Sequence, residues 1–115
     1  MNWPPQPGDQ LPRADACWYG PIKFEEWILA PRGHGREWQQ VFGVGLEDRE
    51  RVWRALTSAA DSAVIVEVRD RGSDGLVCGI RERVTVGTRS ANVTMSWHYE
   101  DSGAAPRLAT AYPSP

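Results

Sequence analysis

The spacing of the apolar residues changes near residue 62, and this change constrains the fold more than any other feature of the chain. Before it, apolar residues recur every three or four positions, as on one face of an α-helix. After it, apolar and polar residues alternate, as in a strand that buries one face. The sequence therefore predicts a helical part followed by a sheet.

Three helices are expected in the first part, over residues 21–30, 36–42 and 47–60. Pro21 suits the first turn of a helix, where its missing N–H group has no intrahelical partner to lose. Each helix carries one tryptophan on its apolar stripe, and all three are predicted to be core residues: Trp27, Trp38 and Trp53.

Four strands are expected in the second part, over residues 63–69, 76–86, 91–99 and 107–112. The turns between them are short, and strands joined by short turns pair antiparallel. We therefore predict an α+β fold in which N-terminal helices pack on one face of a four-stranded antiparallel sheet. Glu82 falls in the apolar register of its strand, which indicates a bulge or an edge position.

The chain has 115 residues, the size of one domain with a single core. Residues 1–11 are rich in proline and are expected to form a flexible N-terminal arm with Trp3 as its contact to the body, while residues 12–115 form the single α+β domain. The sequence has no apolar signal segment and no apolar run long enough to cross a membrane. We therefore expect a cytoplasmic protein, or one delivered without a conventional signal peptide.

The net charge of −2 and the pI of about 5.6 argue against binding to nucleic acid by bulk electrostatics, so any phosphate site must be local. Cys17 and Cys78 lack the spacing of a metal site or of a disulfide framework and are expected to be small buried or half-buried side chains. No metal-binding or cofactor-binding motif occurs, so no cofactor is expected.

The sheet face opposite the helices is predicted to be polar and to gather residues suited to phosphate chemistry. The second strand brings Arg81 and Arg83 to this face, and the third brings Thr94, Ser96 and His98. Such a set can hold a phosphodiester and cleave RNA: a base takes the proton of the ribose 2′-hydroxyl, cations stabilise the charge on phosphorus, and an acid protonates the leaving 5′-oxygen. The alternative is a solvated face whose arginines pair with acidic neighbours, namely Glu67, Glu82 or Glu100.

A second candidate site is the segment RGHGREW, residues 32–38. Glycines on both sides of His34 allow a tight bend, and Arg36 follows at the start of a helix, where an anion can bind. The same residues also fit an ordinary connection between helices. In the last strand, strict alternation places Arg107 on the face opposite Thr110 and Tyr112, so either the strand is bulged or the three do not serve one site.

Four segments of the chain are similar to a family of small bacterial domains of unknown function: LPRAD (11–15), KFEEWIL (23–29), GREWQQVFGVG (35–45) and the end of the chain, 96–113. The closing motif of that family is PRLVTAYP, and this chain reads PRLATAYP. The family is grouped with the barnase–EndoU–colicin–RelE-like (BECR) fold. The resemblance implies an α+β ribonuclease toxin that needs no metal, with RNA as substrate and a cognate antitoxin or immunity protein as partner.

The resemblance marks Lys23, Arg107, Thr110 and Tyr112 as motif positions, and the residue pattern adds others. The candidates for catalysis are His98, His34, Arg83, Arg107 and Tyr112. The candidates for binding are Lys23, Arg36, Arg81, Ser96 and Thr110. Many relatives carry a basic or histidine-lysine pair where this chain has Glu37 and Trp38. That departure, with the low pI, favours the alternative of a non-enzymatic interaction protein on the same fold: immunity-like, regulatory or accessory to a mobile element.

Overall fold

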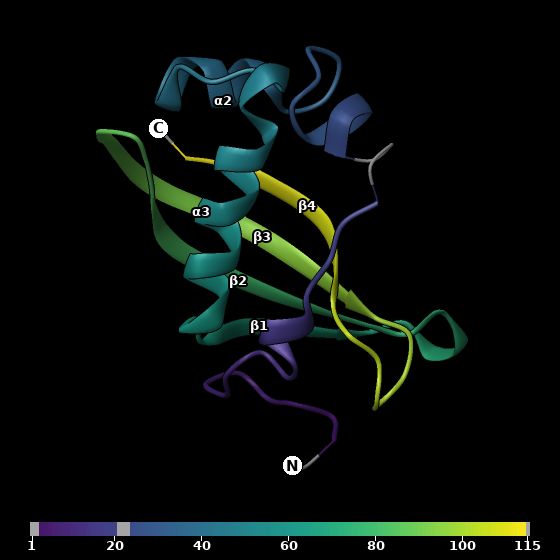
Figure 1. Cartoon of the computed structure of the whole chain (residues 1–115). Helices are drawn as coiled ribbons and strands as arrows, with labels where there is room; N and C mark the ends of the chain where they lie inside the picture. The colour runs from purple at the N-terminus through teal and green to yellow at the C-terminus, as the bar shows by residue number, and fades with distance from the viewer. Residues whose placement is uncertain (1–2, 21–23, 115) are drawn as a thin grey trace.

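A four-stranded antiparallel sheet forms one layer of the protein, and helices form the other (Figure 1). The computed structural model describes residues 3–20 and 24–114. The strand order is β1-β2-β3-β4, so each strand pairs with its neighbours along the chain. The predicted α+β fold, with helices packed against an antiparallel sheet, is confirmed.

The strands lie close to the predicted ranges: β1 (Ile65–Asp70), β2 (Leu76–Val86), β3 (Arg89–Tyr99) and β4 (Arg107–Pro113). The alternation in β3 has the predicted consequence. Its apolar residues are fully buried beneath the helices: Val93, Met95, Trp97 and Tyr99. The polar residues of β3 alternate with these and therefore point to the opposite face. That face lies away from the helical layer (Figure 1).

Two α-helices cover the apolar face of the sheet. Helix α3 (Arg49–Asp61) packs on β2, and α2 (Gly35–Phe42) packs on β3 and β4. A 3-10 turn, η3 (Leu46–Asp48), precedes α3, so the third predicted helix begins two residues later than expected. Within the part of the chain that the structure describes, no helix is long and apolar enough to cross a membrane.

The first predicted helix is not an α-helix where it is described. Residues Phe24–Ile28 form a π-helical turn, η2, in which the Leu29 N–H donates to the Phe24 carbonyl at 3.1 Å. The wider π turn places Phe24, Ile28 and Leu29 inside and turns Trp27 outward, where it is 45% exposed. The prediction that Trp27 is a core residue is therefore wrong. Trp38 is buried as predicted.

Trp53 lies at the edge of the core and is partly buried. Its ring contacts the rings of Tyr19, Phe24 and Trp97, with centroids 4.6, 6.2 and 6.1 Å away. The apolar stripe of α3 continues through Val52, which is fully buried. The predicted orientation of this helix is therefore confirmed.

Glu82 is not at a bulge, because β2 and β3 pair without interruption along their whole length. Strand β1 first pairs with β2 at Ile65 and Ile80, so Glu82 lies beyond the end of β1, at the edge of the sheet. The edge alternative is therefore confirmed and the bulge alternative is wrong. The bulges lie elsewhere, at Val66 in β1 and at Ala109 in β4.

The N-terminal segment, expected to be a flexible arm, lies against the sheet. The Gly8 N–H donates to the Ile65 carbonyl at 2.8 Å, and Leu11 belongs to the buried core. Further along, the Leu108 N–H donates to the Trp18 carbonyl at 2.9 Å. Residues 8–18, here called the edge strap, therefore contact both outer edges of the sheet, at the start of β1 and at β4 (Figure 1).

Candidate functional site

The bulge in β4 decides which residues share the polar face of the sheet. Arg107 lies opposite His98, but Thr110 lies opposite Ser96, so Ala109 is the extra residue between them. Directly opposed residues of antiparallel strands point to the same face. Arg107 and Thr110 are therefore on one face, and the same pairing pattern brings Tyr112 there.

The polar face is organised in rows that cross the strands. One row contains Val77, His98 and Arg107; the next contains Gly79, Ser96 and Thr110; the third contains Arg81, Thr94 and Tyr112. The first and third rows cross β3 at His98 and Thr94, which are four positions apart along the strand, about 13 Å. The candidate residues therefore form two clusters at opposite ends of the face, with small side chains between them.

His34 belongs to the Tyr112 end because its two flanking glycines pack tightly. A Cβ atom on Gly33 would lie 1.7 Å from the Trp27 carbonyl oxygen, and one on Gly35 would lie 2.4 Å from the Leu29 carbonyl oxygen. The His34 N–H itself donates to the Trp27 carbonyl at 2.9 Å. Only glycine permits this approach, so the GHG segment fixes His34 against the π-helical turn.

The imidazole of His34 has three contacts that orient it, one of them with the Trp27 ring, which meets it edge-on with centroids 6.1 Å apart. The His34 ring stacks on the ring of Tyr112, with centroids 4.9 Å apart and an angle of 29° between the planes. Its Nδ1 atom lies 2.8 Å from Glu37 Oε2. A carboxylate only accepts hydrogen bonds, so Nδ1 donates, and in the neutral form of the ring Nε2 holds the lone pair. The side chain is 25% exposed, which leaves it open to a ligand.

Arg81 and Arg83 are the cationic residues of β2 on the polar face of the sheet. Both are exposed, and Arg81 lies in the same row as Tyr112, two strands away. In the ranges 3–20 and 24–114, neither arginine forms an ion pair, whereas Glu67 pairs with Arg69 at 3.1 Å. The expected pairing of these arginines with Glu67, Glu82 or Glu100 is therefore not seen there.

His98 lies at the other end of the face, and its ring is held by a backbone carbonyl. Its Nε2 atom donates to the Asp74 carbonyl at 2.6 Å. Its Nδ1 atom is covered and has no partner among the residues described. His98 and Arg107 line a small hollow, which is separate from His34. The structure therefore does not bring the two histidines into one site.

The remaining candidates take different positions. The Thr110 hydroxyl is buried without a hydrogen-bond partner in the described part of the chain, and Ser96 lies opposite it. Lys23 lies outside the described residues. Arg36 is exposed on the first turn of α2, at the rim of a cavity of about 500 Å³.

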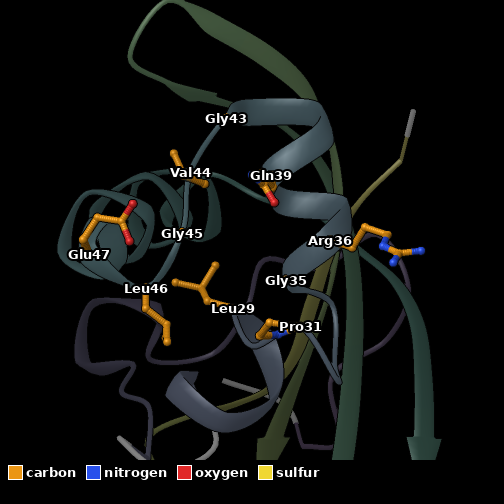
Figure 2. A pocket seen from close by; sticks show the side chains of 10 residues that line it. All are labelled: Leu29, Pro31, Gly35, Arg36, Gln39, Gly43, Val44, Gly45, Leu46 and Glu47. Carbon is orange, nitrogen blue, oxygen red and sulfur yellow. The ribbon is translucent and has the colours of Figure 1, made fainter.

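That cavity lies between the end of the π-helical turn, α2 and η3. Leu29, Val44 and Leu46 supply its apolar wall, and Glu47 is at its far side (Figure 2). Figure 2 shows the Arg36 side chain directed away from Leu46 and Glu47. The cavity therefore has no convergent set of polar groups, and its location is distinct from the polar face of the sheet.

No group of three or more histidine, cysteine, aspartate or glutamate side chains converges as a metal site in the residues that the structure describes. The comparisons of this chain with family models, with known proteins and with solved structures find no match. The candidate site therefore rests on the geometry of the chain itself.

Glu37 was not among the predicted functional residues and was noted only as a departure from a family pattern. The signal was present, because His34 and Glu37 are three residues apart at the start of a predicted helix, where such side chains are neighbours. Trp18 was also missed. It carries no local signal, because its place beside Arg107 depends on pairing between distant segments.

Proposed function

We propose that this chain is a ribonuclease domain that cleaves RNA without a metal ion, with His34 as the general base. The observation that carries the proposal is the hydrogen bond between His34 Nδ1 and Glu37, which in the neutral form leaves the partly exposed imidazole with a lone pair on Nε2. A carboxylate in this position also stabilises the imidazolium that forms when Nε2 takes a proton.

The proposed reaction is an internal transfer at phosphorus. His34 Nε2 takes the proton of the ribose 2′-hydroxyl, and the 2′-oxygen forms a bond to phosphorus. The bond from phosphorus to the 5′-oxygen breaks, and the Tyr112 hydroxyl donates a proton to that oxygen. The products are a 2′,3′-cyclic phosphate and a 5′-hydroxyl, and a proton returned from His34 to Tyr112 restores the site.

Arg81 is the proposed ligand of the scissile phosphate. Two strand spacings separate it from Tyr112, about 10 Å between Cα atoms, which the long arginine side chain can bridge in part. Its charge stabilises the phosphorane as negative charge builds on the oxygens. Arg83 lies two residues further along β2, on the same face. Its charge extends the positive surface to the neighbouring phosphate.

The test is cleavage of a short fluorescent RNA by the purified protein in the presence of a chelator. We expect wild-type protein to release fragments with cyclic phosphate ends and His34→Ala to release none. Arg54→Ala is the control, because Arg54 is exposed on α3 in the helical layer and pairs only with Glu50 in the described part of the chain, and it should retain cleavage. Thermal unfolding of each variant separates lost chemistry from lost structure. Equal cleavage by wild type and His34→Ala would remove His34 from the mechanism.

The proposal includes action in the cytoplasm, where RNA is the substrate, and a neutralising protein such as an antitoxin or immunity protein. Expression of the chain should then arrest growth, and co-expression of the partner should relieve the arrest. His34→Ala should be harmless in the same strain. Arrest that is equal for wild type and His34→Ala would contradict an RNA-based cause.

The second candidate function is a non-enzymatic interaction protein, and one observation favours it. Val64 and Val66, beside and within the outer strand β1, are 45% and 60% exposed. The edge strap pairs with this outer strand only near Val64 and Ile65, so the part that follows can accept a further strand from another protein. Intact RNA and normal growth at good yield of wild-type protein would favour this function.

A further inference from the structure

We infer that the His98 end of the polar face is a nucleobase-binding subsite, in which a base stacks on Trp18 while Arg107 holds a neighbouring phosphate. The inference rests on the proposed function, since it names how the RNA substrate is held away from the reacting phosphate. It uses residues that the proposed chemistry leaves without a role.

Trp18 is fixed at the edge of β4 by two backbone hydrogen bonds. Its N–H donates to the Pro106 carbonyl at 3.1 Å, and its carbonyl accepts from the Leu108 N–H at 2.9 Å. This parallel bridge sets Trp18 opposite Arg107, so both side chains leave the sheet on the polar face. The backbone is thus rigid while the indole remains 48% exposed.

A hollow of about 180 Å³ lies between these side chains. It is lined by Trp18, His98, Glu100, Ala104, Ala105 and Arg107. The volume corresponds to that of about six water molecules in the liquid, which suits one planar ring. The two alanines keep the hollow open, because neither side chain is long enough to fill it.

The walls of the hollow match the parts of a nucleotide. An exposed indole is a stacking surface for any base. Arg107, without an ion pair in the described part of the chain, offers a planar donor for phosphate. Glu100 can accept from an amino or imino group on the edge of a base.

Only small side chains lie between the subsite and the proposed reaction centre. They form the row of Gly79, Ser96 and Thr110. The two ends of the face are about 13 Å apart along β3, a distance that a short single-stranded RNA can span. The substrate is therefore inferred to be single-stranded RNA that crosses the strands of the sheet.

The experiment measures binding of a fluorescent 2′-O-methyl oligonucleotide of mixed sequence by anisotropy. Its blocked 2′-oxygen prevents cleavage, so binding is read apart from chemistry. We expect Trp18→Ala to weaken binding at least about fivefold, which is the lower end for loss of one stacked base. Trp18→Phe retains a stacking ring and should stay within about threefold of wild type. Val66→Ala, another exposed apolar side chain, is the control and should bind like wild type.

Equal affinity of wild type and Trp18→Ala would overturn the subsite, and so would absence of binding by wild type. Arg107→Gln gives an independent test if Trp18→Ala does not fold, and it should also weaken binding. Cleavage of unmodified RNA is measured on the same proteins. Cleavage with no dependence on Trp18 would overturn the subsite alone, whereas Trp18-dependent binding without cleavage would overturn the proposed function alone.

Discussion

Trp38 donates its indole N–H to the backbone carbonyl of Ala111 at 3.1 Å, and the whole side chain is buried. The bond joins α2 to the outer edge of β4. His34 lies one turn before Trp38, and Tyr112 follows Ala111, so the same contact holds the imidazole over the tyrosine ring. The Trp38–Ala111 hydrogen bond therefore contributes both to the stability of the fold and to the geometry of the proposed site.

Trp38→Phe should lower both the stability of the fold and the rate of the proposed RNA cleavage. The substitution keeps an aromatic ring in the core but leaves the Ala111 carbonyl without its donor, which costs about 1–3 kcal/mol of the free energy of unfolding. Urea unfolding measures the loss. Trp27→Phe is the matched control, because Trp27 is 45% exposed, and it should change stability by less than about 0.5 kcal/mol. Equal losses of unfolding free energy for the two variants would show that the Trp38–Ala111 hydrogen bond contributes little to stability.

Gly33→Ala should be destabilising because its new Cβ atom would meet the Trp27 carbonyl oxygen at 1.7 Å. The backbone must then move, at a cost of about 1–3 kcal/mol. Gly20→Ala is the control, since no atom lies within 4 Å of its Cβ position. Thermal unfolding compares the two. A Gly33→Ala protein as stable as Gly20→Ala would mean that the GHG segment does not fix His34 as described.

Glu37→Gln should lower the rate of RNA cleavage while the fold stays intact. The amide oxygen can still accept from His34 Nδ1, but the negative charge that stabilises the imidazolium is lost. Hydrogen bonds to charged groups contribute about 1.5–3 kcal/mol, so we expect a loss of about tenfold to a hundredfold in kcat. Glu26→Gln, which breaks only an exposed ion pair with Arg32, should cleave at the wild-type rate.

The protein should lose stability in alkaline solution in part through Cys78. Burial raises the pKa of this thiol to about 11. The unfolded thiol, with its ordinary pKa of about 8.5, releases its proton first, so the unfolded state binds fewer protons and stability falls as the pH rises. The contribution is complete below about pH 8.5 and is lost progressively up to about pH 11.

Unfolding free energies of wild type and Cys78→Val across this pH range measure the effect. The variant should show a shallower decline, because the titrating group is gone. Burial also raises the pKa of Tyr99, so part of the alkaline loss should persist in the variant. Identical pH profiles for the two proteins would mean that the Cys78 thiol is not protected from solvent in the folded state.

The sheet was predictable because alternation is a local property of the chain. In β3, every second residue from Val93 to Tyr99 is apolar, and one face is buried as a result. The π-helical turn was not predictable, because Phe24, Trp27 and Ile28 have the spacing of an α-helical stripe. Which of them turns outward depends on how the turn packs on the sheet.

The candidate site was predictable in its residue types and less so in its grouping. His34 and Tyr112 were both named, but their contact joins segments that are far apart in sequence and depends on how α2 packs against β4. The bulge at Ala109 has no signature in the sequence, because alanine fits a regular strand equally well. That single extra residue brings Arg107 to the face of Thr110.

The edge strap has a consequence for the order in which the protein is completed. Its residues leave the ribosome long before Pro106 and Leu108, with which Trp18 forms backbone hydrogen bonds. Contacts between such distant segments form slowly because a long loop must close. A nascent chain therefore carries an uncovered sheet edge until β4 has left the ribosome, and in that interval it is prone to associate with other chains.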